Sequence, residues 1–168
     1  MRERPCFGKT LEIMKSTLIL IALLLSVIFQ TTLIPFVAVF GVVPNLVLVL
    51  ILILIIWKKF ENTWWMILLA CLFLDLLSGL LFGLISLSLI ITAYLIDQFN
   101  RNVFSEIKLW IIGSLIVLGS LIYFVSLFSL NSFFQIDFVF NLKYLLIEIL
   151  YNLLIGSILY VWIKKIFC

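Results

Sequence analysis

Long runs without charge dominate this chain of 168 residues. Residues 16–57 and 109–136 contain no charged side chain, and residues 62–96 contain one. A single helix made of the 42 residues in the first run would be about 63 Å long, roughly twice the hydrocarbon thickness of a membrane. The first run must therefore reverse direction once. The run at 62–96, about 52 Å long by the same arithmetic, must reverse as well.

Composition places the chain among membrane proteins. Hydrophobic residues make up 66% of it and charged residues 11%, which is more apolar surface than one small soluble core could cover. No linker or internal repeat divides the sequence. We therefore expect an all-α, polytopic membrane protein in which residues 1–168 form a single integral membrane domain.

Residues that weaken helices mark the two reversals. Pro35, Gly41 and Pro44 interrupt the first run, and Gly79 and Gly83 interrupt the second. Six transmembrane spans result, at residues 16–38, 43–57, 62–79, 83–97, 109–130 and 143–163. The second and fourth spans are short for a hydrocarbon layer of about 30 Å, which indicates local thinning of the bilayer or helix ends buried in protein.

Basic residues predict the orientation of these spans. With both termini in the cytoplasm, ten of the eleven Lys and Arg residues fall on the cytoplasmic side, and only Lys143 falls outside. An excess of positive charge is typical of cytoplasmic loops, so this orientation is the expected one. The ten residues are Arg2, Arg4, Lys9, Lys15, Lys58, Lys59, Arg101, Lys108, Lys164 and Lys165.

Asp75 is the single charge between Glu61 and Asp97. A charged side chain at the centre of a membrane span costs roughly 2.5 to 3.5 kcal/mol on insertion scales, so it normally has a partner and a function. We expect Asp75 in the outer half of the bilayer, about 20 Å from the cytoplasmic start of its span. It either contributes to a functional site or makes a structural hydrogen bond that holds its helix to the second or sixth span.

Four further polar side chains are expected in the same leaflet. Asn45 opens the second span, and Ser78 lies nearly one turn beyond Asp75. Glu148 and Asn152 share one face of the sixth span because they are four residues apart. We expect these five side chains to converge on a site facing the outer half of the bilayer. Alternatively, Glu148 is solvated at the membrane surface, and Asn152 bonds only a neighbouring helix.

Gly79 and Gly83 form a Gly-x-x-x-Gly pair, a spacing that also occurs at helix-packing faces in membranes. A turn is the favoured interpretation, because the pair falls where the run has to reverse. Pro44, directly before Asn45, has the same two interpretations, a turn or a helix-packing position.

The sequence offers little for catalysis. It contains no histidine, no glycine-rich phosphate-binding loop, and no serine, cysteine or lysine visibly set beside a base. Its three cysteines have neither a disulfide framework nor a metal-ligand spacing. No basic cluster exceeds two or three residues. We therefore expect no enzymatic activity, no cofactor, no metal and no nucleic-acid site.

Four segments, in their order and spacing, are similar to a known family. They are Val43-Pro44-Asn45-Leu46-Val47-Leu48-Val49-Leu50, then Asp75-x-x-Ser78-Gly79-x-x-x-Gly83, then Ala93-Tyr94-Leu95, and a last helix with an acidic residue and Asn152 that closes on Lys164 and Lys165. This pattern resembles MreD, the rod shape-determining membrane proteins, over essentially the whole chain. The chain departs from the family at Ile67 and Cys71, where glycines are usual, and it lacks a proline common in the last helix.

The resemblance implies a protein that acts through partners in the bacterial cytoplasmic membrane. It implies six spans with the fold of the substrate-binding subunits of energy-coupling-factor transporters. MreD-like proteins associate with MreC, a bitopic protein, and through it with the MreB filament, RodA and a class B penicillin-binding protein. The chain would then be a non-catalytic component of the cell-elongation (rod) complex, the elongasome, and would support lateral-wall peptidoglycan synthesis and cell shape.

Two other functions remain open. The first is the substrate-binding membrane subunit of an energy-coupling-factor vitamin transporter, which an outer-leaflet polar cluster would suit. Against it, the first helix lacks the Ala-x-x-x-Ala surface that such subunits typically use to meet their partner. The second is an intramembrane enzyme acting on a polyprenyl-phosphate lipid. It would need Arg or Lys on the outer side near Asp75, and only Lys143 is there.

Overall fold

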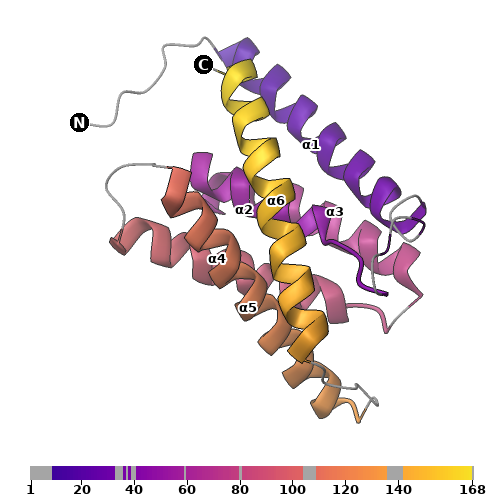
Figure 1. Cartoon of the computed structure of the whole chain (residues 1–168). Helices are drawn as coiled ribbons and strands as arrows, with labels where there is room; N and C mark the ends of the chain where they lie inside the picture. Colours follow the sequence, from indigo (N-terminus) through magenta and orange to yellow (C-terminus); the bar gives the residue numbers. More distant parts are fainter. Residues whose placement is uncertain are drawn as a thin grey trace.

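Six α-helices form the protein. A computed structural model gives the fold and describes residues 9–32, 36, 38, 41–58, 60–79, 81–103, 109–135 and 142–167. The helices are α1 (Lys9–Thr32), α2 (Leu46–Trp57), α3 (Phe60–Ser78), α4 (Leu84–Val103), α5 (Leu109–Phe133) and α6 (Leu142–Phe167). They pack as one bundle, in which α6 crosses in front of α2 in the view of Figure 1.

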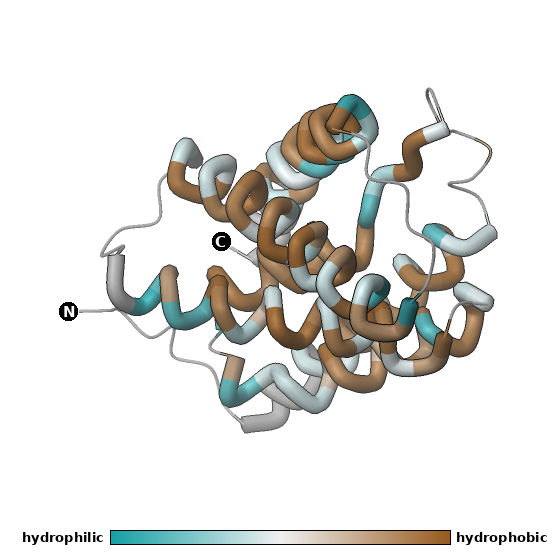
Figure 2. The backbone as a smooth tube through the Cα atoms, turned by 90° about the horizontal axis from the view of Figure 1, so that it is seen from below, coloured by the Kyte–Doolittle hydropathy of each residue, from teal (hydrophilic) through white to brown (hydrophobic). Residues whose placement is uncertain are grey.

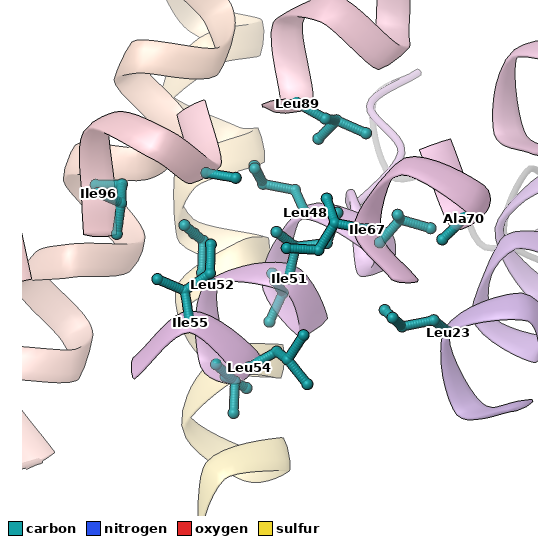
Figure 3. Packing of buried hydrophobic residues seen from close by; sticks show 14 of the residues in the cluster. Leu23, Leu48, Ile51, Leu52, Leu54, Ile55, Ile67, Ala70, Leu89 and Ile96 are labelled. Carbon is teal, nitrogen blue, oxygen red and sulfur yellow. The ribbon is translucent and has the colours of Figure 1, made fainter. Parts of the chain in front are cut away.

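The shortest helix, α2, is the centre of the bundle. Nine of its twelve residues are buried, and it contacts each of the other five helices. Figure 3 shows Leu23 of α1, Ile67 of α3 and Leu89 of α4 approaching the side chains of α2. A helix that is apolar on all sides needs such a buried position or a membrane around it.

The other helices surround α2 in the order α1, α3, α4, α5 and α6, because each contacts the next in this series. The ring is open between α6 and α1, which make no contact over the residues that the structure describes. The order departs from the chain order only because α2 lies inside.

Two glycines allow α2, α5 and α6 to approach closely. A Cβ atom on Gly156 of α6 would lie 2.3 Å from Ile116 Cδ1 and 3.3 Å from Val49 Cγ1. A Cβ atom on Gly119 of α5 would lie 2.6 Å from Leu52 Cδ1. Small residues at these positions permit the close packing on which helix association in membranes depends.

The six helices confirm the all-α architecture expected from the sequence. Their ends differ from the expected spans: α1 runs from Lys9 to Thr32 instead of 16–38, and α4 continues to Val103 instead of 97. At the start of α1 and the end of α4 the reason is that hydropathy marks only the apolar part of a helix, whereas backbone hydrogen bonding continues into its polar flanks. The end of α1 at Thr32 falls within the apolar run, three residues before Pro35, and a proline disfavours continuation of a helix. Outside the described residues lie Pro35, Cys6, Cys168, Arg2, Arg4, Lys59 and Lys108.

Three helical segments are long and apolar enough to cross a membrane, namely Phe60–Ser78, Trp110–Phe133 and Leu142–Trp162. Ser16–Thr32 and Leu46–Trp57 are shorter apolar helices. Hydrophobic residues run along most of the helical length in Figure 2. These lengths and this composition fit a multi-pass membrane protein.

Candidate functional site

Asp75 binds the turn that follows its own helix. Its Oδ2 accepts the backbone N–H of Gly83 at 3.0 Å and that of Ser86 at 3.1 Å, and its Oδ1 accepts that of Ile85 at 3.1 Å. Oδ2 also accepts the hydroxyl of Ser86. Oδ2 thus accepts three donors and Oδ1 one, in a side chain that is only 3% exposed.

The local sequence explains this geometry. Between the end of α3 at Ser78 and the start of α4 at Leu84, Gly79 and Gly83 have φ angles of 69° and 95°, which glycine adopts most readily. The turn brings the first N–H groups of α4 back to Asp75, and these groups have no partner within their own helix. The structure thus places both glycines in the turn, the interpretation that the sequence favours.

A second group of polar side chains holds the start of α2. Asn152 of α6 accepts the backbone N–H of Asn45 through its Oδ1 at 2.9 Å, and Gln30 of α1 accepts that of Val47 at 2.9 Å. The side chain of Asn45 is the N-cap and accepts the N–H of Leu48 at 3.0 Å. These three amide oxygens satisfy N–H groups that the first turn of α2 leaves without a helical partner.

Asn152 also joins this group to α5. Its Nδ2 donates to the Ser120 hydroxyl oxygen at 3.2 Å, and the Asn152 side chain is fully buried. Tyr123, nearly one turn further along α5, is hydrogen-bonded to the side chain of Asn45 and lies within electrostatic range of Glu148. These five residues form a polar contact between α2, α5 and α6, hereafter the α2 junction.

A third group lies at the opposite end of the α3–α4 pair. Asp97, 2% exposed, accepts the backbone N–H of Phe60 through Oδ1 at 3.4 Å and pairs through Oδ2 with Arg101 at 2.5 Å. Arg101 also pairs with Glu61 at 2.9 Å. The hydrogen bond to Asp97, and then the one to Glu61, raise the pKa of the Arg101 guanidinium above its usual value. The ends of α3 and α4 are therefore joined by charge as well as by packing.

The five residues expected to converge separate into two groups, and Glu148 is linked to its group by an electrostatic interaction with Tyr123. Asp75 belongs to the α3–α4 turn, and Ser78 donates its hydroxyl to the Asp75 carbonyl oxygen at 3.0 Å. Asn45, Glu148 and Asn152 belong to the α2 junction. The two groups lie near each other, since Tyr123 interacts electrostatically with Asp75 as well as with Glu148.

Pro44 is buried directly before the N-cap of α2. Its position is the end of the segment that leads into the helix, where a residue without an N–H group leaves no donor to satisfy. Pro44 therefore belongs to the entry into α2.

Sequence reasoning missed several residues of these groups, namely Gln30, Ser86, Asp97, Ser120 and Tyr123. Gln30 is an isolated amide in an uncharged run, and Asp97 is four residues before Arg101, so both carried a signal. Ser120 and Tyr123 carried none, because the expected span at 109–130 contains four serines and the last span three tyrosines, and nothing in the sequence distinguishes one from another.

The chemistry of these groups is that of helix capping. Among the described residues, every buried side-chain nitrogen or oxygen has a hydrogen-bond partner. Within the same residues, no group of three or more His, Cys, Asp or Glu side chains could hold a metal ion. The arrangement fixes where helices begin and how they are placed against one another.

No family model, curated protein or solved structure matches this chain.

Proposed function

We propose that this protein is a non-catalytic membrane component of the bacterial cell-elongation (rod) complex, with six spans in the cytoplasmic membrane. The observation that carries the proposal is the use of its buried polar side chains. Asp75 receives four donors from its own hairpin, and Asn152 connects α2 and α5. With these groups engaged internally, the apolar outer surface is what the bundle offers to a partner. The MreD-like order of the polar motifs supports the same function.

The contacts between helix ends support the proposed topology. Lys58 at the end of α2 donates to the Ser16 hydroxyl of α1 at 3.4 Å, and Arg101 of α4 pairs with Glu61 of α3. These two contacts bring parts of four helices, α1 to α4, together at one end of the bundle, where the basic residues Lys58 and Arg101 lie. Lys143 lies at the start of α6, the end expected outside. This distribution agrees with cytoplasmic termini under the positive-inside rule.

An apolar stripe on α6 suits a partner helix. Leu146, Leu150, Leu154 and Ile158 follow one another at intervals of one turn and are 55 to 62% exposed. Helices associate in lipid through close packing, since the hydrophobic effect gives no preference for protein over acyl chains. We propose that an MreC-like bitopic protein docks on such a face, and that it connects the chain to an MreB filament, RodA and a class B penicillin-binding protein.

Purification from native membranes tests this function. We expect a bitopic protein with a periplasmic domain to co-purify with the chain, and depletion of the chain to make rod-shaped cells round. The double substitution Leu150→Trp and Leu154→Trp should weaken co-purification. The matched control is Leu25→Trp, at a position of α1 that is 53% exposed. Normal cell shape on depletion, with no bitopic protein recovered, would contradict the proposal.

A vitamin-transporter subunit is the alternative, and one observation favours it. The α2 junction gathers Asn45, Tyr123, Glu148 and Asn152 in the half of the bundle opposite its basic end. The same fold, that of energy-coupling-factor substrate-binding subunits, is proposed in both cases. Native mass spectrometry separates the two functions, because a stoichiometric vitamin would favour the transporter and a co-purifying bitopic protein the rod complex.

A further inference from the structure

The turn between α3 and α4 is apolar and exposed. Leu76, Leu77, Leu81 and Phe82 are between 47 and 66% exposed, and no charged residue occurs between Asp75 and Asp97. Turns that face water are normally built from polar residues. An uncharged turn with exposed leucine and phenylalanine side chains is suited to hydrocarbon.

The start of α4, directly after this turn, is satisfied without water. Asp75 accepts the N–H groups of Gly83, Ile85 and Ser86, which are the donors that the start of α4 cannot use within the helix. In the hydrocarbon of a membrane an unsatisfied N–H group costs several kcal/mol, because no water is there to accept from it. A buried carboxylate that accepts these donors removes that cost from a helix start within lipid.

Tryptophans mark the membrane boundary at the other end of the bundle. All five lie at or near the helix ends where the basic residues Lys58 and Arg101 are found, and they are 37 to 70% exposed. They are Trp57, Trp64, Trp65, Trp110 and Trp162. Tryptophan is enriched at both interfaces of a membrane, so these five residues place one interface at that end, and the basic residues make it the cytoplasmic one in the proposed topology.

Side-chain contacts hold these helix ends at one level. The ring of Trp57 at the end of α2 packs against that of Tyr160 in α6, with centroids 6.2 Å apart. The first residue of α3, Phe60, donates to Asp97 of α4. Depth along α3 can therefore be measured from its tryptophans at this end, whereas α6 continues seven residues beyond Tyr160 on the same side.

The part of α3 between its tryptophans and the turn is shorter than the hydrocarbon layer. Trp65 and Ser78 are 13 residues apart in α3, which corresponds to about 20 Å along the helix. The hydrocarbon core of a membrane is about 30 Å thick. The turn after Ser78 thus lies about 10 Å short of the outer boundary of the hydrocarbon.

We infer that the α3–α4 turn, with Leu81 and Phe82 at its tip, lies within the hydrocarbon of the outer leaflet and contacts lipid acyl chains. The inference rests on the proposed membrane topology and is independent of the partners in the rod complex.

Thiol accessibility in proteoliposomes of purified protein tests the inference. Cys6 and Cys168 are replaced by serine, and Cys71 stays because it is fully buried. Single cysteines are introduced as Leu81→Cys, Phe82→Cys and, as the matched control, Ser132→Cys at the exposed outer end of α5. A membrane-impermeant maleimide should label the control on the outer side and fail to label the two turn cysteines. Labelling of all three at the same rate would overturn the inference.

A nitroxide at position 82 gives a second measurement that does not depend on thiol reactivity. Its collisions with oxygen should exceed those with a water-soluble nickel complex, with the opposite order for a nitroxide at position 132. The opposite order at both positions would place the turn in water. Because only purified protein and lipid are present, protection cannot come from a partner protein. If the proposed function failed, with no bitopic protein co-purifying from native membranes, the result in proteoliposomes would stay the same.

Discussion

Asp75 and Asp97 cap each other's helices. Asp75, near the end of α3, accepts three N–H groups at the start of α4, and Asp97, in α4, accepts the first N–H group of α3. The two helices are thereby fastened at both ends by buried acids that are 3% and 2% exposed.

Replacement of Asp75 should unfold the hairpin turn. Asp75→Leu leaves the N–H groups of Gly83, Ile85 and Ser86 without an acceptor, at a cost of about 1 to 3 kcal/mol for each. Asp75→Asn keeps one acceptor oxygen and should cost less. Ser86→Ala, which removes only the hydroxyl donor, is the control. Thermal unfolding in detergent should rank Asp75→Leu lowest, and an unchanged unfolding temperature for that variant would contradict the capping role.

The α2 junction predicts a selective crosslink. Cysteines at positions 45 and 152 should form a disulfide on mild oxidation, because Asn152 bonds the backbone of Asn45 at 2.9 Å. The pair at positions 75 and 152 should not react, since Asp75 is held inside the α3–α4 hairpin. Non-reducing gels of membranes provide the measurement. Equal crosslinking of both pairs would contradict two separate groups and would support the single convergent site that was expected from the sequence.

Gly156 should not tolerate a larger side chain. Gly156→Leu forces atoms into Ile116 and Val49, and overpacking of this kind typically costs about 1 to 3 kcal/mol. Gly113→Ala is the matched control, because no atom lies within 4 Å of its added Cβ. That substitution should stabilise α5 by up to about 1 kcal/mol through helix propensity. A free energy of unfolding that falls equally for both variants would show that the α2–α5–α6 contact is not tight.

Arg101 should matter more to stability than Glu61. Removing Arg101 leaves Asp97 buried without its charge partner, whereas Glu61→Gln changes a side chain that is 67% exposed. We expect Arg101→Leu to lower the unfolding temperature clearly and Glu61→Gln to have little effect. The raised pKa of Arg101 favours its charged form, so its contribution is present below its unfolded pKa and is lost only as pH rises through the folded value. Equal unfolding temperatures for the two variants would argue against the Asp97 pair.

The six helices and the positions of the reversals could be predicted from the sequence. The physical reason is length: an uncharged run longer than the bilayer has to fold back, and it does so at its glycines and prolines. The departures at the start of α1 and the end of α4 arose because hydropathy describes the apolar part of a helix and hydrogen bonding describes all of it. These features depend on residues near one another in the chain.

The partners of the polar groups were decided only by the tertiary structure. Asp75 was expected either in a functional site or bonded to the second or sixth span, and the structure gives it the N–H groups of its own turn, because two left-handed glycines fold the start of α4 back onto it. Gln30 and Ser120 gained their roles because α2 lies at the centre of the bundle, with its first turn between α1 and α6. Helix order and rotation set these contacts, and a single sequence specifies them only through the packing of the whole chain.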